Sequence, residues 1–168
     1  MRLAIIGATG SIGTQALDVA SEHPERFTVV ALAAGSESER FSTLRSEHPH
    51  AHAITGGSRE DLIALVEASA PDLVLVASTG LVALPATLAA LRGGAAVAIA
   101  NKETIVAGGE LVIAAARDAA ARADTSVLER LRPVDSEHSA LWQCLAGEDP
   151  SSVATLWLTA SGGPFRER

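Results

Sequence analysis

Short apolar runs along this chain alternate with longer segments in which apolar residues recur at helical spacing. The runs contain few charged residues, as expected for strands that are buried on both faces of a sheet. The clearest are RLAIIG (residues 2–7), FTVVALAAG (27–35), PDLVLVAST (71–79) and AAVAIAN (95–101). AHAIT (51–55) is a weaker strand, LERLRPV (128–134) is a further candidate, and SVATLWLTAS (152–161) is predicted to be a strong strand.

The segments between these runs are typical of amphipathic helices. The first has apolar residues at Ile12, Ala16, Leu17 and Ala20 and stops before Pro24. Further helices are predicted at residues 37–48, 58–69, 81–94, 102–122 and 137–145. The tract 116–132 is compatible with a helix, a linker or both.

Strands and helices alternate at least five times in this reading, which is typical of a parallel sheet covered by helices on both faces. We therefore predict an α/β fold with a Rossmann-like, doubly wound, mostly parallel sheet. The first domain is predicted to span residues 1–134. Residues 135–168 are predicted to begin a second, α+β domain.

Composition and charge narrow the possible partners. Hydrophobic residues make up 48% of the 168 residues and aromatic residues only 3%, so Ala, Val, Leu and Ile must build the core. The net charge of −7 and the lack of a basic run argue against a nucleic-acid partner, because nucleic acids require a positive surface. A phosphorylated ligand remains compatible, since helix N-termini and one or two cations can hold it.

Cysteine content and the N-terminus bear on the compartment. Cys144 is the only cysteine, so no disulfide can form within the chain, and a reducing cytoplasm is the expected location. The apolar start MRLAIIGATG is interrupted at Gly7, which makes it too short for a signal-peptide core or a membrane span. No membrane association is predicted.

A glycine-rich segment, GATGSIG (7–13), joins the first predicted strand to the first helix. Gly7 would permit the tight turn, Gly10 would let a pyrophosphate approach the backbone, and Gly13 would let the helix pack close to the strand. The phosphates would then lie at the helix N-terminus. The alternative is an ordinary strand-to-helix turn without a ligand.

Two later strand ends carry candidate ligand-binding residues. AAGSESER (33–40) ends the second strand, where an acid suits an unphosphorylated ribose and a basic residue suits a 2′-phosphate. This segment contains both acidic and basic residues, so it does not decide between the two forms of the ribose. A helix start capped by a serine is an alternative. ANKETIV (100–106) ends the strand at 95–101 and could hold a phosphate or a cofactor, or could be a capped helix start with a solvated Lys–Glu pair.

The segment DSEHSA (135–140) places two acids two residues apart. Asp135 and Glu137 supply hard oxygen ligands that suit Mg²⁺ or Mn²⁺. Alternatively, Asp135 or Ser136 caps the next helix, with Glu137 favourable in its first turn. His138 alone is typical of a helix surface or of a residue supporting a ligand. Farther on, the glycine turn in TASGGPFRE (159–167) could cradle an anion.

Each of these segments has an ordinary structural explanation, but their combination resembles a known family. GATGSIGTQALDV, ANKETIVAGGEL, PVDSEHSALWQCL and LTASGGPFR, in this order, resemble the 1-deoxy-D-xylulose 5-phosphate reductoisomerase family nearly end to end. The resemblance implies conversion of 1-deoxyxylulose 5-phosphate to 2-C-methylerythritol 4-phosphate in the methylerythritol phosphate pathway of isoprenoid biosynthesis. It implies an NADP-dependent oxidoreductase that is also an isomerase, needs a divalent metal and forms a homodimer.

The resemblance also implies roles for individual residues. The cofactor-binding positions would be Gly7, Thr9, Gly10, Ser11, Ile12, Gly35, Ser36, Glu37, Asn101 and Glu103. The metal would be held by Asp135 and Glu137. The phosphorylated sugar would meet Lys102, Ser136, Glu137 and Ser161, and the catalytic residues would be Glu137 and Lys102.

Two departures from the family qualify these expectations. Ser36 and Glu37 stand where the family commonly has a basic residue or Asn, so 2′-phosphate recognition would rest on Ser36, Ser38 or Arg40, and NADH use is less excluded. Family members are also considerably longer and supply a third metal carboxylate, so we expect this chain alone to bind cofactor but to turn over little. The rival hypotheses are a homoserine- or semialdehyde-type dehydrogenase and a nucleotide-binding module without activity.

Overall fold

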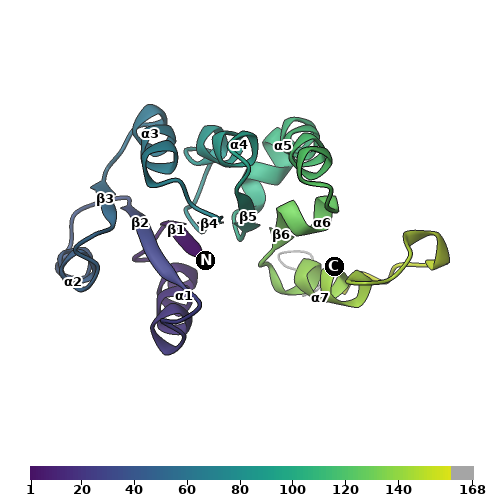
Figure 1. Cartoon of the computed structure of the whole chain (residues 1–168), viewed down its shortest axis with the longest axis horizontal. Coiled ribbons are helices and arrows are strands. Elements are labelled where there is room, and N and C mark those ends of the chain that lie inside the picture. The colour runs from purple at the N-terminus through teal and green to yellow at the C-terminus, as the bar shows by residue number, and fades with distance from the viewer. Residues whose placement is uncertain (160–168) are drawn as a thin grey trace, which may run out of the picture.

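Six parallel strands form one sheet in the computed structural model of the chain, which describes residues 1–159. The strands are β1 (Arg2–Ile6), β2 (Thr28–Ala34), β3 (His52–Thr55), β4 (Leu73–Val76), β5 (Ala96–Ile99) and β6 (Leu131–Pro133). Their order across the sheet is β3-β2-β1-β4-β5-β6 (Figure 1). The order reverses between β1 and β4, which creates the crevice where ligands bind in open α/β sheets.

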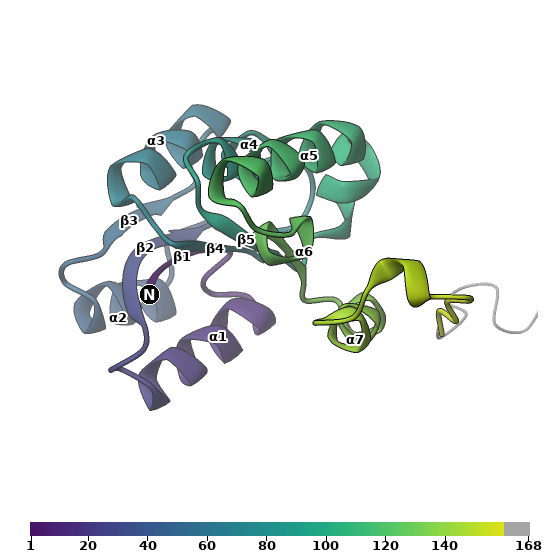
Figure 2. The ribbon, with the colours of Figure 1, turned by 45° about the vertical axis from the view of Figure 1, so that its right-hand side comes forward.

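Helices cover both faces of this sheet, which confirms the doubly wound prediction. They are α1 (Ser11–Glu22), α2 (Glu39–Glu47), α3 (Arg59–Ser69), α4 (Leu84–Arg92), α5 (Lys102–Ala123), α6 (Val127–Arg130) and α7 (Ser136–Leu145), followed by a 3₁₀ turn at Pro150–Ser152. Figure 2 shows α3, α4 and α5 on one side of the sheet and α1 on the other. All the strand pairings of the described residues are parallel, so the sheet is more uniform than the mostly parallel one predicted.

Two cores, one on each face, hold the layers together. One joins alternate strand residues to α3, α4 and α5, and contains Val74 and Val76 of β4, Leu62 of α3 and Leu91 of α4. The other places the remaining strand residues against α1 and α2, where Phe41 is fully buried. The side chains are mostly small, which lets the helices lie close to the strands.

The predicted helix starts agree with the structure. Ser58 forms a capping box with Asp61 at the start of α3, and Pro85 lies in the first turn of α4. Gly108 does not interrupt α5, because it is buried where Leu84 of α4 approaches: a methyl group there would lie 2.6 Å from a Leu84 methyl carbon. The ambiguous tract 116–132 contains the end of α5, the short α6 and the start of β6.

The predicted strand at 152–161 is wrong for residues 153–159, which have no regular secondary structure. Leu156, Trp157 and Leu158 are exposed by 56%, 84% and 56%. A strand is stable only beside a hydrogen-bonded neighbour, and no strand of the described residues lies beside this one. Its last two residues, including Ser161, lie outside the described part of the chain.

No helix among residues 1–159 combines the length and the apolar character that crossing a bilayer requires.

Candidate functional site

The turn between β1 and α1 has the geometry of a dinucleotide-binding loop. Gly7 has φ +99°, and a methyl group on it would lie 2.6 Å from the carbonyl carbon of Ala77. A methyl group on Gly13 would lie 2.2 Å from the carbonyl oxygen of Gly7. Both positions therefore require glycine for backbone reasons, as the sequence predicted.

Gly10 differs from these two because protein packing leaves room around it. A methyl group there would meet the Gly7 carbonyl oxygen at 3.4 Å, an ordinary contact. Gly10 is the N-cap residue of α1, makes no side-chain cap bond and is exposed. The first N–H groups of α1 thus face open space at the positive end of the helix, where an anion can approach the backbone.

A cavity of about 270 Å³ opens beside this turn, at the carboxyl ends of β1, β2 and β4. It is lined by several glycines, among them Gly7, Gly35 and Gly56, and by Ser78. The Ser78 hydroxyl oxygen is buried and has no hydrogen-bond partner among the described residues. A buried hydroxyl without a partner is unusual, and here it lies where a ligand could satisfy it.

Among the residues after β2, Glu37 and Ser38 already have partners within the protein. Gly35 and Ser36 are exposed, and Gly35 lines the cavity. The Glu37 carboxylate accepts a hydrogen bond from Arg45 at 2.6 Å. The Ser38 hydroxyl accepts from the Phe41 N–H at 3.1 Å, so the alternative of a Ser-capped helix start is correct for α2.

Asn101 is a buried anchor at the same edge of the sheet and is 3% exposed. Its Oδ1 accepts the Thr104 N–H at 2.7 Å and caps α5. Its Nδ2 donates to the carbonyl oxygens of Ser78 and Gly80. Asn101 therefore holds the loop after β4, and with it the Ser78 hydroxyl, in place; its predicted contact with the cofactor remains a prediction.

Replacing Asn101 by alanine should destabilise the chain by about 3 kcal/mol, because the cap is lost and two carbonyls lose their donor. Ser38→Ala is the matched control, because it removes a cap bond alone and should cost about 1 kcal/mol. Urea denaturation of both variants checks this prediction. Equal losses would mean that Asn101 acts as a helix cap and nothing more.

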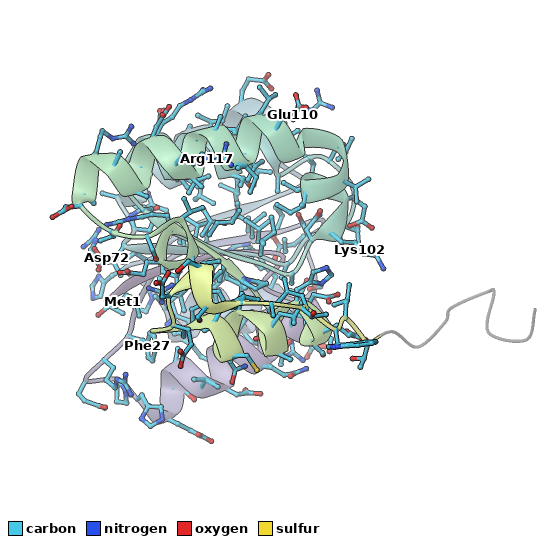
Figure 3. The ribbon with its side chains drawn as sticks, turned by 90° about the vertical axis from the view of Figure 1, so that its right-hand side faces the viewer. Met1, Phe27, Asp72, Lys102, Glu110 and Arg117 are labelled. Atoms are coloured by element: carbon cyan, nitrogen blue, oxygen red, sulfur yellow. The ribbon has the colours of Figure 1, made fainter. Side chains whose placement is uncertain are left out.

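A second cluster forms where α5 and α7 begin. Lys102, Asp135 and His138 line one cavity of about 450 Å³, together with Asn101 and mostly apolar side chains of β5, α5, α6, β6 and α7. The Trp142 indole N–H donates to the Leu128 carbonyl at 2.9 Å and fastens α7 to α6. Figure 3 shows Lys102 at the opposite end of the molecule from Met1 and Asp72.

Asp135 occupies the N-cap position of α7 but makes no cap hydrogen bond. Instead its Oδ1 lies 2.6 Å from His138 Nδ1. This hydrogen bond, with a smaller contribution from the charge of Lys102, holds the pKa of Asp135 below its usual range. Asp135 is therefore ionised at neutral pH, the form that binds a metal.

The metal-binding prediction fits the residues present in part. Asp135 and Glu137 lie together at the start of α7 and offer carboxylate oxygens, which suit Mg²⁺ or Mn²⁺. Within residues 1–159, no group of three or more potential ligands gathers at one place. Ser136 is exposed in the first turn of α7 beside Glu137. The remaining predicted substrate contact, Ser161, lies outside the described residues.

Sequence reasoning missed two features of this site. Ser78 is the second residue after β4, at the carboxyl edge of the sheet, and that position was the available signal. The pairing of His138 with Asp135 follows from their separation of three residues across the start of α7, which brings side chains onto one face. The alternative given for ANKETIV, a capped helix start with solvated Lys102 and Glu103, agrees with the structure, since Asn101 caps α5 and both charged residues are exposed.

Fold and site together define a class of protein. A glycine turn at the first helix, a crevice where the strand order reverses and two acids at the far edge are the features of an α/β dinucleotide-binding domain adjoining a carboxylate site.

The chain belongs to the 1-deoxy-D-xylulose 5-phosphate reductoisomerase family. The model of that family matches residues 3–56 and 44–109, and the model of its C-terminal domain matches residues 131–168. The reductoisomerase of Symbiobacterium thermophilum is 45% identical over 190 residues, which cover 99% of this chain and 47% of the relative. The chain thus spans about half the length of this curated relative.

Solved structures agree with this assignment. The reductoisomerase of Zymomonas mobilis in complex with NADPH superposes with a TM-score of 0.76 at 32% identity, covering 99% of this chain and 47% of the other. A reductoisomerase in complex with magnesium superposes with a TM-score of 0.80 at 30% identity, covering 99% and 48%.

Proposed function

We propose that the protein carrying this chain converts 1-deoxy-D-xylulose 5-phosphate to 2-C-methyl-D-erythritol 4-phosphate by rearrangement followed by NADPH-dependent reduction. Family membership is the observation that carries the proposal. The rival dehydrogenases are not supported, because the family model covers both the glycine turn and the ANKETIV segment. The pathway in which the enzyme would act is non-mevalonate isoprenoid biosynthesis.

NADPH is the proposed cofactor, and the crevice beside Gly10 supports it. The pyrophosphate would lie against the first turn of α1, next to Thr9, Ser11 and Ile12. The buried Ser78 hydroxyl would supply a donor or acceptor that the described residues leave unused. The reduced nicotinamide, when bound, supplies the hydride that reduces the rearranged aldehyde.

A divalent cation, Mg²⁺ or Mn²⁺, is the proposed second cofactor. When bound, it polarises the substrate ketone and stabilises negative charge that develops on oxygen. Asp135 and Glu137 would hold it, and His138 would orient the Asp135 carboxylate through their hydrogen bond. Lys102, on the rim of the same cavity, would face the oxygens of the phosphorylated sugar, with Ser136 and Ser161 as further contacts.

The domain boundary, the oligomeric state and the cellular location are also proposed. The nucleotide domain would end near residue 134, between β6 and α7, and the catalytic domain would begin at residue 135. A homodimer in the cytoplasm is proposed from the family resemblance and from the single cysteine.

The test is an assay of NADPH oxidation by the complete polypeptide that carries this sequence. The reaction is monitored through the loss of NADPH absorbance. We expect oxidation only when both 1-deoxy-D-xylulose 5-phosphate and Mg²⁺ or Mn²⁺ are present, and its loss with a chelator. Oxidation without metal, or none with this substrate, contradicts the proposal. The isolated chain of 168 residues should bind NADPH but turn over little, because the described residues offer only two metal carboxylates.

A further inference from the structure

Arg40 occupies an unfavourable place for a cation. It is the second residue of α2, where the helix dipole is positive and disfavours positive charge. No acidic side chain of the described residues forms an ion pair with it, not even its neighbour Glu39. Glu39, the first residue of α2, offsets part of this cost, but the Arg40 guanidinium itself is held by a hydroxyl group and not by a carboxylate.

A hydrogen bond fixes where the Arg40 guanidinium lies. One of its terminal nitrogens donates to the Thr14 hydroxyl of α1 at 2.7 Å. Thr14 in turn donates to the carbonyl oxygen of Gly10, the N-cap residue of α1. The guanidinium is thus held beside the first turn of α1, on the wall of a cavity that Asp18 and Thr43 also line. It brings a cation close to the helix start that is proposed to hold the pyrophosphate.

Glu37 is the acid that would suit an unphosphorylated ribose, but its carboxylate binds a side chain of the protein. The Glu37 carboxylate is 2.6 Å from Arg45 and 3.4 Å from the Thr55 hydroxyl. Arg45 lies two turns along α2, away from its N-terminus. The ion pair engages Glu37, whereas Arg40 and its neighbour Glu39 form no ion pair among the described residues.

We infer that Arg40 binds the phosphate on the adenosine ribose of the dinucleotide and that the Glu37–Arg45 ion pair keeps Glu37 from repelling it. A guanidinium suits a phosphate because it can donate two parallel hydrogen bonds. Of the three candidates Ser36, Ser38 and Arg40, Arg40 alone carries charge, and the Ser38 hydroxyl already caps α2. The inference rests on the proposed NADPH dependence and deepens it.

The test compares NADPH and NADH, which differ only in this phosphate, by fluorescence titration of the 168-residue chain. Arg40→Ala should weaken NADPH binding by about 10- to 100-fold and change NADH binding by less than about twofold. Arg117→Ala is the matched control, because it removes the same charge from an exposed position on α5. That control should leave both dissociation constants unchanged.

A second variant tests the role of the ion pair. Arg45→Ala frees the Glu37 carboxylate, so we expect the preference for NADPH over NADH to fall by about 3- to 10-fold, chiefly through weaker NADPH binding. Circular dichroism and urea denaturation of each variant establish that the fold is intact.

The outcomes separate the inference from the function on which it rests. If the unmodified chain binds NADPH and Arg40→Ala weakens both dinucleotides equally, or neither, the inference is overturned while the cofactor proposal stands. If the 168-residue chain binds neither dinucleotide, the titration is made on the complete polypeptide that carries it, and absence of binding there overturns both. Selective loss of NADPH binding in Arg40→Ala supports both.

Discussion

Replacing Asp135 by asparagine is expected to lower kcat of the complete enzyme about a thousandfold or more. Asparagine has nearly the same shape but no charge, so the site loses one of the two carboxylates proposed to hold the metal. The loss corresponds to about 4 kcal/mol of transition-state stabilisation, within what a metal that polarises a carbonyl supplies. Steady-state NADPH oxidation with substrate at saturating Mg²⁺ measures it.

The effect should be confined to the metal-dependent step. The affinity for NADPH is expected to stay within about twofold of the unmodified value, since Asp135 lies outside the glycine-lined cavity. Gln143→Ala, at an exposed position on the same helix, is the control and should retain full activity. Near-normal turnover in Asp135→Asn would contradict the proposal that Asp135 is a metal ligand.

The second large effect is expected at Gly13. A methyl group there lies 2.2 Å from the Gly7 carbonyl oxygen and 2.8 Å from the Ala8 Cα, and backbone atoms cannot yield as a flexible side chain can. Gly13→Ala should therefore push α1 away from β1 and lower the free energy of unfolding by about 3 kcal/mol. Urea denaturation of the chain checks the stability, and the NADPH titration should show binding lost as well.

Gly10→Ala is the matched variant, because the same methyl group meets only an ordinary contact at 3.4 Å. Its φ of −75° and ψ of 170° suit alanine, so stability should change by less than about 1 kcal/mol. NADPH binding should nevertheless weaken at least about tenfold, since the methyl group fills the space through which the pyrophosphate approaches. Equal effects of the two variants on stability would contradict this separation of roles.

Local patterns in the sequence were sufficient for most of the secondary structure. The buried strands are nearly uninterrupted apolar runs, and the helices carry their own start signals, as at Ser58. The β6 strand was only a candidate, because three residues give a weak pattern. The 153–159 prediction failed because strand propensity cannot supply the hydrogen-bonding neighbour that a strand requires.

Within the site, the sequence by itself determined the glycine turn and the pair of acids, because these depend on residue type and short spacing. Gly7 and Gly13 are needed by a turn of seven residues, and Asp135 and Glu137 are two residues apart along the chain. The resemblance to the family also depends on such short strings.

Only the tertiary structure decided which side chains already form hydrogen bonds or ion pairs with other parts of the protein. It joined Asn101 to the loop of Ser78 across 23 residues and Arg40 to Thr14 across 26 residues. It also paired Glu37 with Arg45 and so changed the meaning of an acid at the end of β2. Such pairings depend on which elements lie side by side in the folded sheet, and that order is set by packing over the whole domain rather than by the residues next to each site.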